Sequence, residues 1–259
     1  MADFAPHIDL FKITNRLSSF ANGIFWSILV FSFAPFVLKY FSIPEIITDV
    51  INILNIIGIG SFFLIEIVID FILLPQANSK RRDDFIDNAF GSKFSPKNSK
   101  GYYDNDEIGK GLYKASVNLF ENCFFTFSLS KIAIISKIAI PIVMLIAMSI
   151  FSYYGFKEVP LALSILQALF SANVLGLLIK HLILLNRLST IQDSWIILFQ
   201  YENFKSETYK YQANVYRFWL QYETLQSKIN TAIPHRVFSE NNESLTKDWA
   251  DLKEKYNII

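Results

Sequence analysis

The amino-acid sequence predicts an all-α polytopic membrane protein with four transmembrane helices in two hairpins and a helical cytoplasmic region. Two observations predict this class. Apolar residues make up 52% of the 259 residues and charged residues only 18%, whereas soluble globular chains have about 25% charged residues. The apolar residues also gather in runs close to the roughly 20 residues that a helix needs to cross a bilayer.

Four segments are apolar enough to cross: Ala21–Leu38, Ile46–Leu74, Ile138–Tyr154 and Val159–Ile179. Short connections at Lys39–Glu45 and Gly155–Glu158 join them in pairs. We therefore expect two antiparallel hairpins, at residues 21–74 and 138–185. The remaining parts are an N-terminal segment (1–20), an insert (75–137) and a helical tail (186–259).

The distribution of basic residues predicts the orientation. Of 24 Lys and Arg residues, two lie in the N-terminal segment, ten in the insert and ten from Lys180 onward. Only Lys39 and Lys157 lie in the hairpin turns. Because positively charged loops stay in the cytoplasm, we expect the insert and both termini to be cytoplasmic.

The second crossing contains polar residues that are costly in hydrocarbon. At about 100° per residue, these side chains fall within an arc of about 120°, with two apolar members between them. The stripe consists of Asp49, Asn52, Asn55, Ile59, Phe63, Glu66 and Asp70. One interpretation is that three to five copies of the chain assemble and this stripe lines a pore. The alternative is that the carboxylates pair with Lys131, Lys137 or Lys180 and the asparagines join helices within one bundle.

The insert contains a basic run, Lys80, Arg81 and Arg82. This run either anchors the chain at the membrane surface or binds an anionic ligand such as a phosphodiester backbone.

The tail contains two faces of interest. One is a heptad seam with alternating steps of four and three, which predicts helix packing or oligomerisation. Its members are Phe204, Thr208, Tyr211, Val215, Phe218, Tyr222, Leu225 and Ile229. The other face combines basic and aromatic residues, which can stack on nucleic-acid bases, or else belongs to a helix that is buried on both sides. Its candidate ligand-binding members are Lys205, Tyr209, Tyr216 and Trp219.

The sequence contains no pattern typical of an enzyme, a resident cofactor or a metal site. It has neither a phosphate-binding loop nor a nucleophile elbow. Its histidines, His7, His181 and His235, lack the spacing of metal ligands, and Cys123 is the one cysteine. We therefore expect a protein that is not an enzyme and that uses no cofactor.

The insert contains Phe85-Ile86-Asp87 and Phe90, and the tail opens with Ile191-Gln192-Asp193. Together with the order hairpin, insert, hairpin, tail, these residues resemble the four-transmembrane effectors that accompany bacterial nucleotidyltransferases in anti-phage defence. Those effectors belong to cyclic-oligonucleotide systems and to the Hailong system. The resemblance implies an oligomeric channel in the bacterial inner membrane whose opening depolarises the infected cell, with a nucleotidyltransferase encoded nearby. It also implies a ligand, either a nucleotide that activates the effector or a single-stranded oligonucleotide that holds it closed.

Two other functions fit the same pattern. A proton- or cation-coupled transporter would use Glu66 and Asp70 within one protomer, and a non-conducting membrane scaffold would use the tail to recruit partners.

Overall fold

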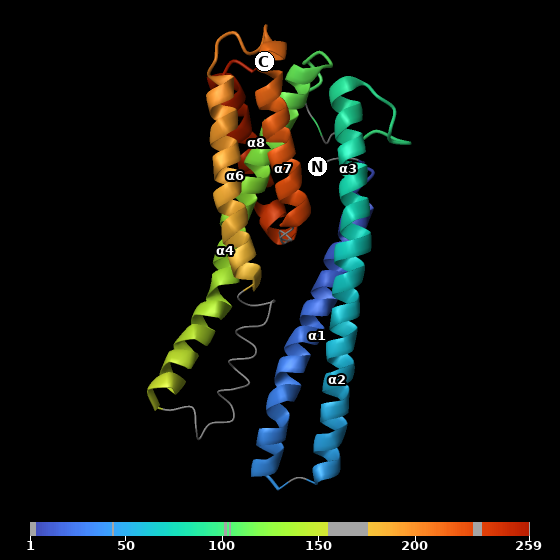
Figure 1. The fold of residues 1–259 in the computed structure, drawn as a ribbon, viewed down its shortest axis with the longest axis vertical. Coiled ribbons are helices and arrows are strands. Elements are labelled where there is room, and N and C mark those ends of the chain that lie inside the picture. Colours follow the sequence, from blue (N-terminus) through green and yellow to red (C-terminus); the bar gives the residue numbers. More distant parts are fainter. Residues whose placement is uncertain are drawn as a thin grey trace. The chain divides into compact units, whose positions relative to one another are not determined.

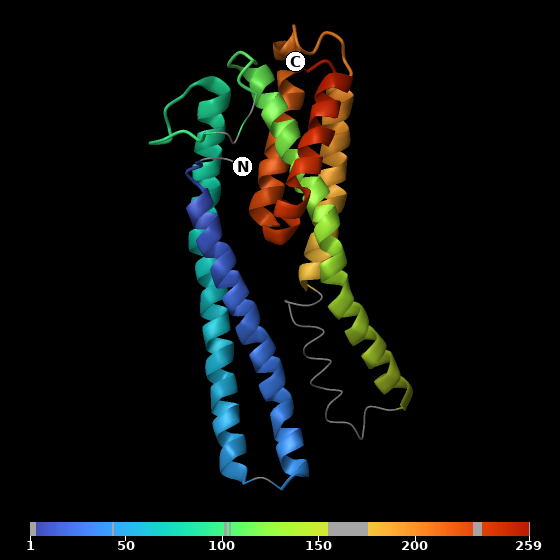
Figure 2. The same ribbon diagram turned by 180° about the vertical axis from the view of Figure 1, so that it is seen from behind.

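The structure is a computed structural model that describes residues 4–42, 44–100, 103, 105–154, 176–229 and 235–258. The regular elements among these residues are helices, with one isolated β-bridge between Phe4 and Lys100 (Figures 1 and 2). The chain divides into two compact units. The bundle unit is Met1–Ile8, Ala77–Ser136 and Ile179–Ile259, and the hairpin unit is Asp9–Gln76 and Lys137–Leu178.

In the hairpin unit, α1 (Ile8–Tyr40) and α2 (Glu45–Val68) lie antiparallel and side by side (Figure 1). Seven of the buried or half-buried positions of this stretch alternate by three and four residues, which is the spacing of a coiled-coil seam. They are Thr48, Ile51, Asn55, Gly58, Phe62, Ile65 and Ile69. The seam faces α1: the rings of Phe25 and Phe62 lie 6.2 Å apart, and a Cβ added to Gly58 would come within 3.1 Å of Ile28.

The second helix extends far beyond the predicted crossing at Ile46–Leu74. A five-residue π-helical segment, Ile69–Leu73, joins α2 to α3 (Leu74–Phe90), so one helix runs over Glu45–Phe90. This helix is long and apolar enough to cross a membrane, and only 6% of its apolar window is buried within the chain.

The described residues contain two or three candidate membrane spans, fewer than the four predicted. Glu45–Phe90 is one and Leu178–Phe199 is another, while Leu112–Ile135 with Lys137–Val143 counts as a third if this bent pair is one span. The predicted crossing Ala21–Leu38 is helical within α1. Val159–Ile179 lies mostly outside the described residues.

The candidate span at Leu178–Phe199 corresponds to α6 (Leu177–Phe199), which runs through the predicted start of the tail at residue 186. One third of its apolar window is buried. The buried positions again alternate by three and four: His181, Leu184, Leu188, Ile191, Trp195 and Leu198. One face of α6 therefore belongs to the core of the bundle unit.

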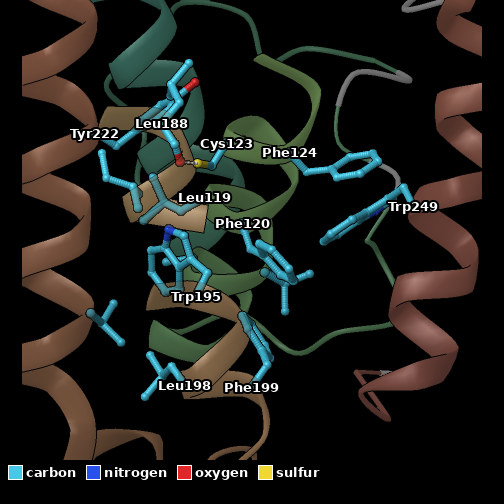
Figure 3. Packing of buried hydrophobic residues seen from close by; sticks show 14 of the residues in the cluster. Leu119, Phe120, Cys123, Phe124, Leu188, Trp195, Leu198, Phe199, Tyr222 and Trp249 are labelled. Atoms are coloured by element: carbon cyan, nitrogen blue, oxygen red, sulfur yellow. Dashed lines mark hydrogen bonds between the residues drawn. The ribbon is translucent and has the colours of Figure 1, made fainter. Parts of the chain in front are cut away.

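The first half of α4 (Leu112–Tyr154) is the central helix of the bundle unit. Seven consecutive residues, Lys114–Phe120, are buried. Because a helix turns once every 3.6 residues, seven buried residues in a row mean that α4 is covered on all sides. Phe120 stacks on Phe199 of α6 at 5.3 Å and meets Trp249 of α8 (His235–Lys255) edge-on at 5.2 Å (Figure 3).

The predicted heptad seam of the tail is buried or half-buried along its whole length. Its helix is interrupted, however. Phe204 lies in a turn, a short 3₁₀ helix follows at Thr208–Tyr211, and α7 runs over Gln212–Lys228. The seam packs within the chain, since Phe218 meets Trp195 of α6 at 5.2 Å and the Tyr222 hydroxyl lies 3.0 Å from Thr126 Oγ1 of α4.

A buried ion pair joins α3 to α7. Arg81 Nη2 lies 2.6 Å from Glu223 Oε2, and the two side chains are only 11% and 13% exposed. Burial alone would lower the pKa of Arg81, but the charge of Glu223 raises it. Burial and the nearby charge of Arg81 lower the pKa of His7 to about 4, so His7 is neutral at pH 7.

We expect the Glu223→Gln substitution to lower the free energy of unfolding by about 3 kcal/mol, because it leaves the Arg81 charge buried without its counterion. The double variant Arg81→Met/Glu223→Gln should lose less than the sum of the two single variants. Thermal unfolding in detergent, followed by tryptophan fluorescence, measures both effects. Additive losses would show that the two groups are not coupled.

Candidate functional site

The predicted stripe of the second crossing is largely exposed within the protomer. Asp49, Asn52 and Asp70 are exposed, as are Ile59 at 52% and Phe63 at 64%. This stripe lies next to the seam that packs on α1, about a quarter-turn away around α2. Among the residues that the structure describes, one face of α2 is therefore covered by α1, and the neighbouring polar face is exposed.

The other two members of the stripe have different surroundings. Asn55 belongs to the seam, where its Nδ2 donates to Ser32 Oγ at 3.1 Å. Glu66 is half-buried. Asn55 thus joins α1 and α2 within one protomer, as the alternative interpretation of the asparagines predicts.

The basic run on α3 does not act as one cluster. Arg81 is engaged by Glu223, and its guanidinium also lies 6.0 Å from the centre of the Tyr222 ring. Lys80 is exposed and Arg82 is half-buried. A ligand would therefore meet Lys80 and Arg82, while the Arg81 charge is neutralised inside the protein.

The basic and aromatic face of the tail is divided in the same way. Trp219 packs against α3, stacked on Phe90 at 6.4 Å and edge-on to Phe85 at 5.1 Å. Tyr209 and Tyr216, in contrast, are 73% and 47% exposed, and Lys205 is exposed. The interpretation of a helix buried on both sides is wrong for these two tyrosines.

Two carboxylates of α3 hold the loop that follows it, a role that the sequence analysis missed. Asp87 accepts hydrogen bonds from Ser92 Oγ at 2.7 Å, the Phe94 amide at 2.9 Å and the Ser95 amide at 2.7 Å. Asp84 Oδ1 accepts from the Ser99 amide at 2.7 Å. The available signal was a pair of aspartates three residues apart, directly before a serine-rich loop.

The two aspartates differ in their electrostatics. Burial raises the pKa of Asp84, with the charge of Asp87 adding to the effect and the Ser99 hydrogen bond opposing it. Burial would also raise the pKa of Asp87, but its hydrogen bonds from Phe94, Ser95 and Ser92 prevail and lower it. Asp84 Oδ2 is buried without a hydrogen-bond partner among the described residues.

The described residues contain no group of three His, Cys, Asp or Glu side chains that could hold a metal ion. His181 lies with Nε2 2.7 Å from the Ser130 carbonyl oxygen, inside the bundle. Cys123 is buried, which raises the pKa of its thiol, and its Sγ lies 3.7 Å from the Leu188 carbonyl (Figure 3).

Comparison of the chain with models of protein families, with curated proteins and with solved structures gave no match.

We expect Asp87→Asn to destabilise the bundle unit by about 1–3 kcal/mol at pH 7, because hydrogen bonds to a charged group are lost. Since folding lowers the pKa of Asp87, its contribution to stability is present above the ordinary aspartate pKa of 3.8 and is lost as the pH falls through the folded-state pKa. Thermal unfolding of the detergent-solubilised chain across the acid range measures this.

Asp84→Asn is the matched control for Asp87→Asn. The pKa of Asp84 is raised by folding, so its charge opposes folding as the pH rises from 3.8 through the folded-state pKa. Removing this charge should stabilise the protein at pH 7, and the advantage should vanish in acid. Equal destabilisation by both substitutions would contradict the roles assigned to the two carboxylates.

Proposed function

We propose that the chain is one subunit of an oligomeric ion channel in a bacterial inner membrane, with both termini in the cytoplasm. In this proposal α2 from each of three to five copies lines the pore. The supporting observation is the exposure of Asp49, Asn52 and Asp70 on an otherwise apolar helix of which the chain buries almost nothing. Polar side chains on such a helix avoid hydrocarbon only by facing a water-filled path or another protein surface.

The order of side chains along the stripe suggests how such a pore would work. Asp49 and Asn52 would form one vestibule and Asp70 the opposite mouth, where a ring of carboxylates favours cations. Ile59 and Phe63 lie between them and would form a hydrophobic constriction that closes by excluding water.

The proposed ligand is a nucleotide or a single-stranded oligonucleotide that binds the tail. Tyr209 lies in the 3₁₀ helix and Tyr216 in α7, and both are exposed. Lys205, four residues before Tyr209 in the chain, is exposed as well. Exposed aromatic rings beside a cation are the usual elements of a base-stacking surface. Gating would require this ligand to bind the open and closed states with different affinity.

The resemblance to the effectors of nucleotidyltransferase-linked defence systems makes depolarisation of an infected cell the proposed biological outcome. The nucleotidyltransferase partner belongs to the same proposal. A non-conducting scaffold remains the second candidate, because the same exposed tyrosines could recruit a protein.

Flux of potassium from liposomes that contain the purified full-length protein tests the channel. We expect Phe63→Ala to increase the basal flux several-fold, because it removes the bulk of the constriction. Leu64→Ala is the matched control, since Leu64 is also 64% exposed but points about 100° away around the helix. Asp70→Asn should lower the preference for cations over anions.

Equal flux from the Phe63→Ala and Leu64→Ala proteins would contradict the pore assignment. The absence of flux from every protein, with and without ligand, would favour the scaffold.

Fluorescence anisotropy with a short labelled oligothymidylate tests the ligand surface. We expect Tyr209→Ala and Tyr216→Ala each to weaken binding by about 5- to 150-fold, the range measured for loss of one stacked base. Phe94→Ala is the matched control, because Phe94 is 64% exposed but lies on the loop after α3. Equal affinity for wild type and both tyrosine variants would refute the assignment.

A further inference from the structure

We propose that α4 and α6 together form a binding surface for the headgroups of anionic phospholipids. The proposal rests on the membrane crossing proposed above but not on ion conduction. It concerns one end of the bundle unit, where exposed apolar and basic side chains lie next to each other. Its members are Lys131, Ile132 and Ile135 of α4, and Ile179, Lys180, Leu182, Ile183 and Arg187 of α6.

A buried contact between α4 and α6 places the two parts of this surface next to each other. His181 Nε2 lies 2.7 Å from the Ser130 carbonyl oxygen, and both residues are fully buried. Lys131 and Lys180 are the chain neighbours of these two residues, and both are exposed. Two cations on different helices thus flank one contact. Arg187, seven residues after Lys180, lies on the same side of α6 and is also exposed.

The apolar members are too exposed for a surface that faces water alone. Ile135 is 75% exposed, Ile179 is 53% and Leu182 is 47%. These residues lie outside the seam through which α6 packs into the bundle. Clusters of exposed aliphatic side chains on a protein surface mark a contact with a membrane or another protein.

The charges identify the partner as anionic. Residues 122–154 and 176–192 contain four Lys or Arg residues and no Asp or Glu. None of Lys131, Lys180 and Arg187 forms an ion pair within the part of the chain that the structure describes.

The position in the chain favours lipid over a soluble anion. The basic residues of α4 directly precede the apolar segment 138–154, and α6 begins at the end of the predicted crossing Val159–Ile179. Basic side chains can place their aliphatic stems on an apolar surface while the charge reaches the headgroup layer. Basic clusters next to a crossing bind anionic leaflets in this way.

Native mass spectrometry of the full-length protein in detergent, titrated with phosphatidylglycerol or phosphatidylcholine, tests the proposal. We expect wild type to prefer phosphatidylglycerol by at least about tenfold. Lys180→Gln/Arg187→Gln should lose about 25-fold in that affinity, since each basic residue near a lipid surface contributes about fivefold. Lys180→Arg/Arg187→Lys, which keeps both charges, should bind like wild type.

The control variant is Arg217→Gln/Lys228→Gln, which removes one exposed arginine and one exposed lysine from the tail and should leave lipid binding unchanged. Millimolar inorganic phosphate should not displace the lipid; displacement would show that the site takes free phosphate instead. Equal binding of both lipids, or unchanged binding by Lys180→Gln/Arg187→Gln, would overturn the proposal. Potassium flux through the Phe63→Ala protein, measured after reconstitution into liposomes, reports separately on the channel.

Discussion

The bundle unit is built around a segment of α4 that has no solvent-exposed face. Residues 114–120 of α4 are buried on every side, so each polar side chain in this stretch needs a partner inside the protein. Lys114 lies 3.2 Å from Asp106, the Ser116 hydroxyl donates to the Leu112 carbonyl, and Asn118 Nδ2 donates to Asn88. These polar partners come from three places: the turn before α4, α4 itself and α3.

The helices of the hairpin unit are much less buried than residues 114–120 of α4. There α2 has a single seam against α1 and no fully buried residue. Its aliphatic side chains can meet lipid without cost, but Asp49, Asn52 and Asp70 cannot. In the bundle unit Lys114, Ser116 and Asn118 have partners within the chain, whereas Asp49, Asn52 and Asp70 of the stripe are exposed. In the proposed channel, oligomerisation around water would give these three side chains polar surroundings.

Several charged residues of α3 make contacts that stabilise the fold. Arg81 is paired with Glu223, and Asp84 and Asp87 hold the following loop. Among the residues that underlie the family resemblance, Phe85 and Ile191 are buried in the core and Asp87 is a loop anchor. Those three positions therefore have structural roles in this chain, whereas Lys80, Lys205, Tyr209 and Tyr216 are exposed.

The extension of the second helix to Phe90 and the interruption of the tail helix before α7 were not predicted. The sequence by itself determined the helical class and the heptad spacing of the tail. These follow from local periodicity, because a helix repeats every 3.6 residues whatever surrounds it. Only the tertiary structure decided which basic and aromatic residues are packed within the chain and which stay exposed. Arg81 and Lys80 are neighbours of the same charge, and Trp219 and Tyr216 are aromatic residues three positions apart. One member of each pair is packed inside and the other exposed, because segments more than 100 residues away in the chain come to cover one face and not the other.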